Sequence, residues 1–286
     1  MSRYRRSDRK SIATSAGVIE YRDIGSGKPV VFVHGAFLNG ALWNDVVFYL
    51  PPDLRLILLD LPLGGHRLPV AADADLTPPA LAELLLDVVE AFDLRAVTLV
   101  GSDIGVAICR LAVSRGDRRA RRIAGLLFTN ADAFGEHAAG RRFGEVALDK
   151  AGLDDIASRL PTGAGRKAFF ERLVWAPLPD AEIRDLLGGF MESADVRGNA
   201  LHALEGASHT PLPSGRETFD GPVKVLWGVE DHGLPVELGA RLAATFANGE
   251  LREVPEARLL VPLDQPESVA EAILDILEAH KPADAP

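Results

Sequence analysis

The stretch at residues 97–112 constrains the fold of this chain more than any other. It begins with an apolar, β-branched run that predicts a buried strand, and it ends in an apolar pattern typical of a helix. Between them lies Gly-x-Asp-x-Gly, with Asp103 flanked by Gly101 and Gly105. A strand that turns into a helix so abruptly strains its central residue, and small neighbours let the backbone segments approach closely. The motif therefore predicts that Asp103 projects from the end of a sheet. The alternative is that Asp103 only caps the helix.

Strand-like and helical patterns alternate along most of the chain. Apolar runs predict a hairpin over residues 11–24 and strands at residues 29–33, 54–59, 123–129, 222–227 and 251–254. Helical patterns lie at residues 41–50, from residue 77 onward, at 235–246 and at 266–279. This alternation predicts an α/β fold with a mostly parallel sheet that helices cover on both faces.

Residues 133–218 interrupt this alternation. They hold helical pieces broken by Gly and Pro, and no strand is evident. We interpret them as a helical cap over a pocket, inserted between a first core part at residues 1–132 and a second at residues 219–286. At 286 residues and 47% hydrophobic, the chain is long enough to bury one large core.

The composition narrows the classes of partner. A formal net charge of −10 argues against nucleic acid and anionic membranes, so we expect a small-molecule substrate. The basic N-terminus is not followed by the apolar segment of a secretory signal, and no run is long enough to span a bilayer. The single cysteine, Cys109, excludes an internal disulfide and is consistent with a cytoplasmic location. No metal-ligand spacing is present, and we expect neither a metal nor a cofactor. The oligomeric state stays open.

Several residues are candidates for the predicted pocket. Ligands of α/β sheets bind beyond the carboxyl ends of the strands, so residues that follow the expected strands are favoured. A structural hydrogen-bonding role is the preferred interpretation for His34, and Trp175 could simply pack in the cap. The residues that we place around the substrate pocket are His34, Phe37, His66, Phe134, His137 and Trp175.

The order of these segments over residues 17–279 resembles the α/β-hydrolase superfamily. The motif at Asp103 is similar to that of its haloalkane dehalogenase and epoxide hydrolase branch, in which an aspartate attacks carbon and a histidine-activated water hydrolyses the resulting ester. The resemblance implies that Asp103 is the nucleophile and that the backbone N–H groups of Ala36 and Ile104 form an oxyanion hole. It also implies that Asp231 orients the histidine, with Asp132 as the alternative acid.

The chain departs from that branch at the histidine itself. Leu259, shortly before residues 262–267, stands where the imidazole is expected. Ile104 replaces the tryptophan that follows the nucleophile in dehalogenases, and the predicted cap has none of the tyrosines that epoxide hydrolases use. A positioned general base is worth roughly 10²–10⁴ in rate, so its loss must be compensated or tolerated. The candidate substitutes are His66, His137, His202 and His209.

Three functions remain open at this point. The favoured one is a hydrolase with Asp103 as nucleophile, acting on a small apolar substrate such as an alkyl halide or epoxide, with a non-standard or missing base. The second is a non-hydrolytic lyase, isomerase or cyclase in which Asp103 is a general base. The third is a ligand-binding protein that has lost its catalytic activity. One fold can carry all three, so the site must decide.

Overall fold

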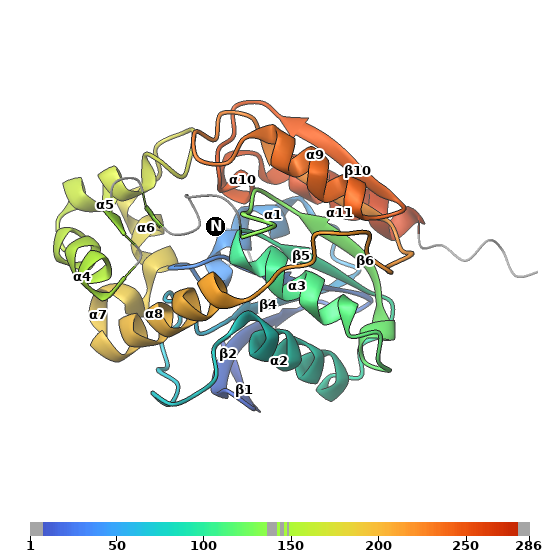
Figure 1. Cartoon of the computed structure of the whole chain (residues 1–286), viewed down its shortest axis with the longest axis horizontal. Helices are drawn as coiled ribbons and strands as arrows, with labels where there is room; N and C mark the ends of the chain where they lie inside the picture. The colour runs from blue at the N-terminus through green and yellow to red at the C-terminus, as the bar shows by residue number, and fades with distance from the viewer. Residues whose placement is uncertain (1–7, 136–141, 144–145, 148, 280–286) are drawn as a thin grey trace, which may run out of the picture.

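The computed structural model of the chain describes residues 8–135, 142–143, 146–147 and 149–279. A central sheet has helices on both faces, and a further group of helices lies at one end of it (Figure 1). This is the α/β-hydrolase architecture that the sequence predicts. Within the described residues, no helix is both long enough and apolar enough to cross a membrane.

The central sheet has eight strands in the order β1-β2-β4-β3-β5-β6-β9-β10. The β1–β2 and β2–β4 pairs are antiparallel and the remaining pairs are parallel, so the sheet is mostly parallel as predicted. The strands are β1 (Lys10–Thr14), β2 (Gly17–Ile24), β3 (Lys28–Val33), β4 (Leu54–Asp60), β5 (Val97–Gly101), β6 (Ile123–Phe128), β9 (Val223–Gly228) and β10 (Gly249–Val254).

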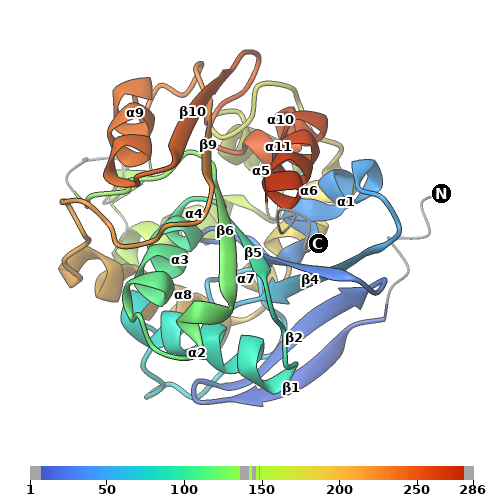
Figure 2. The same ribbon diagram turned by 90° about the vertical axis from the view of Figure 1, so that its right-hand side faces the viewer.

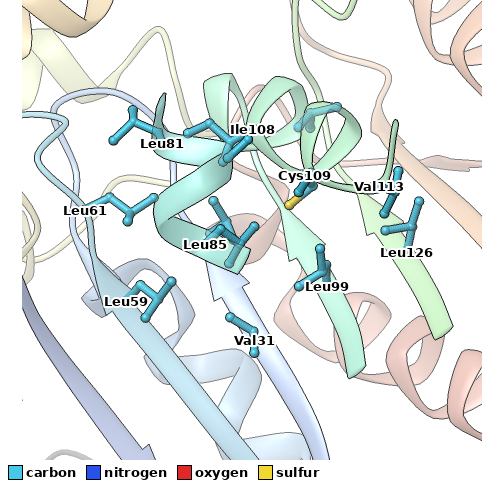
Figure 3. Close-up of a cluster of buried hydrophobic side chains, with 14 of the residues drawn as sticks. Val31, Leu59, Leu61, Leu81, Leu85, Leu99, Ile108, Cys109, Val113 and Leu126 are labelled. Atoms are coloured by element: carbon cyan, nitrogen blue, oxygen red, sulfur yellow. The ribbon is translucent and has the colours of Figure 1, made fainter. Parts of the chain in front are cut away.

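Both faces of the parallel strands β3, β4, β5, β6 and β9 are buried, which explains why they read as largely apolar runs. In β3, Val31 and Val33 belong to the cluster beneath α2 (Pro78–Ala91), α3 (Ile104–Ser114) and α9 (Val236–Thr245). Figure 3 shows part of that cluster, with side chains of α2 and α3 packed on the strands. Val30 and Phe32 point to the opposite face. Fully burying each such side chain contributes about 1.5–3 kcal/mol.

The opposite face is covered mainly by α1 (Asn44–Tyr49) and α11 (Pro266–Ala279), with the short α10 (Val261–Asp264) beside them (Figure 2). The helix expected at residues 41–50 divides into a 3₁₀ turn, Gly40–Trp43, and α1. The Asn39 side chain caps the turn by accepting a hydrogen bond from the Ala41 N–H.

Among the described residues, five helices lie between β6 and β9, in the region predicted as a cap. They are α4 (Lys150–Arg159), α5 (Gly163–Phe170), α6 (Asp180–Leu187), α7 (Gly189–Glu192) and α8 (Ala194–His209). The expectation of no strand here was wrong, because β7 (Arg142–Phe143) and β8 (Val146–Ala147) form an antiparallel pair. Strands of two residues are too short to produce a period in the sequence. The boundaries of the cap at residues 133 and 218 stay predictions.

The strand order reverses around β3, which lies between β4 and β5. The loops that follow β3 and β5 therefore leave the sheet side by side and open a crevice at its carboxyl edge. Backbone hydrogen bonds hold these loops together: the Ser102 N–H donates to the Val33 carbonyl, and the Asp103 N–H donates to the Asn130 carbonyl after β6. The sheet topology thus brings residues 34–37, 102–104 and 130–132 to one place.

Candidate active site

Asp103 stands at a sharp turn between β5 and α3. Its φ of 53° and ψ of −126° define a backbone conformation that residues other than glycine rarely adopt. A Cβ added to Gly105 would lie 2.3 Å from the Val33 carbonyl oxygen, so only glycine permits this close approach of α3 to β3. The Asp103 side chain forms no capping hydrogen bond with α3. The carboxylate is directed elsewhere.

The Asp103 carboxylate reaches across to the loop that follows β3. Its Oδ2 accepts a hydrogen bond of 2.9 Å from the Ala36 N–H, and the neighbouring Ile104 N–H also lowers the pKa of the carboxyl group. These are the two amides that the resemblance implies as an oxyanion hole. The hydrogen bond from Ala36 fixes the orientation of the carboxylate, as an attacking group requires.

A cavity of about 380 Å³ adjoins this carboxylate. Eight residues named from the sequence line it: Ala36, Phe37, Asp103, Ile104, Asp132, Phe134, His209 and Leu259. The helical region contributes Leu204, His209 and Leu212 to the lining of the cavity, so α8 and the segment after it form part of its wall. Most of the lining is apolar, which suits a small apolar ligand. Among the described residues, no group of three or more His, Cys, Asp and Glu side chains is placed to hold a metal ion.

The charges around Asp103 favour its neutral form. Burial raises the pKa of the Asp103 carboxyl above its usual range, and the Ala36 and Ile104 N–H groups oppose that effect. The negative charges of Asp132 and Asp231 raise the pKa of Asp103 further. The site therefore contains a carboxyl group that is a better proton acceptor than a carboxyl group in water.

The two candidate orienting acids lie in different settings. Asp132 lines the cavity with Asp103, whereas Asp231 does not. Asp231 accepts hydrogen bonds from the Gly233 N–H (2.9 Å), the Leu234 N–H (3.2 Å) and the Asn130 side chain (3.0 Å). Burial raises the pKa of Asp231, and these hydrogen bonds oppose the rise. Asp231 thus holds the loop after β9.

The structure shows where the position that the resemblance assigns to a histidine lies. Leu259 lines the cavity, so an apolar side chain borders the site where the resemblance places an imidazole. What replaces the imidazole must come from another segment or be absent.

His34 and His66 lie outside the cavity lining, although we expected them in the substrate pocket. The His34 Nε2 accepts from the Leu61 N–H at 2.9 Å, and its Nδ1 lies 2.8 Å from the Gly35 carbonyl. Burial lowers the pKa of His34. His34 therefore supports the loop beneath the site, which is the role that the sequence analysis preferred.

His66 joins the loop after β4 to the helical region. The Gly64 N–H donates to its Nδ1 at 3.2 Å, so its Nε2–H donates to the Asn199 Oδ1 of α8, also at 3.2 Å. Burial lowers the pKa of His66 to about 4, which keeps the ring neutral near pH 7. With both nitrogens occupied, His66 is a brace between core and cap.

The predicted aromatic residues divide among different environments. Phe134 lines the cavity, and its ring lies between the guanidinium groups of Arg110 and Arg241, 5.3 and 3.8 Å from its centroid. Trp175 borders a separate hollow, is 46% exposed and contacts Arg258, so it does not line the cavity at Asp103. His137 lies outside the described residues.

Other lining residues had no signal in the sequence. Pro78 opens α2, and Leu173 and Leu204 belong to the helical region, yet all three border the cavity. They meet there because distant helices converge, which no local pattern reports. His209 was named only as one of several possible bases, and it is a histidine that the structure places in the lining.

The sequence profile of the Alpha/beta hydrolase family matches residues 30–272. The chain belongs to the alpha/beta hydrolase family. Several of its relatives are enzymes by name, and this alpha/beta hydrolase has a strained turn at the end of β5 with an adjoining cavity.

Individual relatives of this alpha/beta hydrolase have differing activities. A non-heme chloroperoxidase of Kitasatospora aureofaciens is 28% identical over 82% of this chain and 86% of its own length. Haloalkane dehalogenase 2 of Mycobacterium bovis is 26% identical over 92% of each chain. A solved structure of a thermophilic esterase from Thermogutta terrifontis superposes with a TM-score of 0.72 at 24% identity, covering 96% of this chain and all of the esterase. The similarity fixes the fold but leaves the reaction to the site residues.

Proposed function

We propose that this hydrolase uses Asp103 to attack an electrophilic carbon of a small apolar substrate, such as an alkyl halide or an epoxide. The observation that carries the proposal is the position of one carboxylate. Asp103 borders an apolar cavity, and its Oδ2 already accepts a hydrogen bond from the Ala36 N–H. Its other oxygen can then attack, while Oδ2 becomes the carbonyl oxygen of the ester.

The proposed first step is a displacement at carbon. An Asp103 carboxylate oxygen forms a bond to the substrate carbon, and the halide leaves with the electrons of its bond. For an epoxide, the ring oxygen leaves as an alkoxide and takes a proton. A carboxylate in an apolar cavity is poorly hydrated, which makes it a stronger nucleophile than a carboxylate in water. Asp132, in the same lining, is the second carboxylate that we assign to this site.

Intact-protein mass spectrometry tests the proposal directly. The protein is mixed with a panel of primary alkyl bromides and terminal epoxides, quenched in acid within seconds, and digested to locate the modified residue. We expect a mass increase equal to one alkyl group, located at Asp103, and none in Asp103→Asn. If no member of the panel modifies Asp103 in the folded protein, the nucleophile assignment is wrong.

A second function is favoured by one observation, the leucine at position 259. Without an imidazole there, Asp103 with its raised pKa could instead remove a proton from the substrate, as in a lyase or isomerase. Single-turnover reactions in ¹⁸O-labelled water separate the two. Ester hydrolysis places ¹⁸O in the Asp103 side chain, whereas proton abstraction does not. A protein that only binds its ligand would show neither label nor turnover.

A further inference from the structure

We infer that His209, the last residue of α8, is the base that activates water for hydrolysis of the Asp103 ester. The inference rests on the proposed function, because it concerns the second step of that reaction. It assigns to a residue of the helical region the task that an apolar side chain at position 259 cannot perform.

The position of His209 is the first argument. Within the part of the chain that the structure describes, His209 is the histidine that lines the cavity at Asp103. Its side chain is also exposed to solvent, so it stands where the cavity meets bulk water. A hydrolytic water that enters from this side passes His209 on its way to the apolar interior.

The hydrogen bonds of the ring are the second argument. The His209 Nδ1 lies 2.7 Å from the Glu205 carbonyl oxygen and 3.1 Å from the Ser208 Oγ. The Ser208 hydroxyl donates to that same carbonyl, so it can accept from the ring. A carbonyl oxygen only accepts, which places the hydrogen of the neutral ring on Nδ1 and leaves the lone pair on Nε2. The ring is held in the form that accepts a proton at Nε2.

The end of α8 is the third argument. The helix end is packed closely against the start of α2. A Cβ added to Gly206 would lie 3.0 Å from the Cα of Thr77, whose neighbour Pro78 lines the same cavity. His209 is thus held at the cavity edge.

Hydrolysis of the ester passes through a tetrahedral intermediate. Water adds to the Asp103 Cγ while the His209 Nε2 takes one of its protons, and the Ala36 and Ile104 N–H groups hold the oxyanion. The Cγ–O bond to the substrate then breaks, and the imidazolium gives its proton to the leaving oxygen. The products are an alcohol and an Asp103 carboxylic acid that contains one oxygen from water and releases its remaining proton to solvent.

The test compares formation and loss of the ester in His209→Gln. With 1-bromobutane as probe and rapid quenching, we expect the ester to form within about twofold of the wild-type rate. Its hydrolysis should slow by roughly 10²–10⁴, so that the modified protein accumulates. Free imidazole should restore part of the hydrolysis rate in His209→Gln, which a merely structural defect would not allow.

Two matched variants complete the test. His202→Gln changes a histidine of the same helix that does not line the cavity, and its ester should hydrolyse at the wild-type rate. His137→Gln should do the same. Wild-type hydrolysis in His209→Gln, or accumulation in His137→Gln instead, overturns the assignment of the base. Absence of ester in every protein, the wild type included, refutes the nucleophile and with it this inference.

Discussion

Gly35 sets the distance between the oxyanion hole and the attacking carboxylate, and Gly35→Ala tests that geometry. A Cβ at position 35 would lie 2.7 Å from both the Asp103 Oδ2 and the Asp103 Cβ. Ordinary contacts begin at about 3.4 Å, so the carboxylate must retreat by about 0.7 Å. That retreat would lengthen the 2.9 Å hydrogen bond from the Ala36 N–H to about 3.6 Å, which is no longer a hydrogen bond.

The lost bond sets the magnitude of the effect. A hydrogen bond to a charged group is worth about 1.5–3 kcal/mol, which corresponds to roughly a 10- to 150-fold change in rate. Removal of one oxyanion-hole donor in a hydrolase costs about 10²–10³ in rate, which agrees with the upper part of this range. Negative charge develops on this oxygen when water adds to the ester, so we expect Gly35→Ala to slow hydrolysis of the Asp103 ester by one to two orders of magnitude.

The assay is the rate at which the added mass is lost after brief alkylation with 1-bromobutane, with samples quenched rapidly in acid. Gly198→Ala is the control, because a Cβ at this position in α8 meets nothing within 4 Å. It should leave the rate unchanged, and replacing a helical glycine by alanine should stabilise the fold by about 0.5–1 kcal/mol. A folded Gly35→Ala protein, judged by circular dichroism, whose ester hydrolyses within twofold of the wild-type rate would refute the reasoning.

Three further predictions follow from the site and its supports. Burial raises the pKa of Asp103 in the folded state, so the stability that its neutral form provides is present at low pH and lost as pH rises through that pKa. Urea titrations at pH 7 should therefore give Asp103→Asn a free energy of unfolding about 0.5–2 kcal/mol above that of the wild type. A stability gain that grows toward acid pH would contradict this. Arg110→Met leaves Glu217, its buried partner at 2.6 Å, without a counter-charge; a loss of about 3–5 kcal/mol is expected, and a loss below 1 kcal/mol would count against it. Introducing Leu259→His into His209→Gln should shorten the lifetime of the Asp103 ester, and an unchanged lifetime would show that position 259 cannot serve the reaction.

Local sequence predicts the central sheet well because each strand carries its own signal. The apolar runs that become β3 and β5 are buried on both faces, and the motif at Asp103 allows few other conformations. The position of Leu259 in the cavity also followed from segment order alone. Where the chain is locally constrained, sequence and structure agree.

The composition of the cavity wall was harder to predict because it depends on packing between distant segments. His66 and Trp175 are residue types that are common in ligand pockets. In the structure, however, His66 joins two segments by hydrogen bonds, and Trp175 contacts Arg258. Leu204 carries no functional signal but lines the cavity, because α8 crosses the carboxyl edge of the sheet there. The fold of the helical region decides which side chains face the ligand.

The cost of keeping Asp103 in place argues that the residue is functional. An aspartate that caps a helix lowers its energy by accepting from the second or third backbone N–H, and Asp103 makes no such bond with α3. It has instead a strained φ of 53°, two acidic neighbours and little solvent. Strain and buried charge of this kind reduce stability, and they persist where function requires them. The Ala36 N–H, which donates to Oδ2, and the Ile104 N–H offset part of this cost, and the carboxylate borders the cavity.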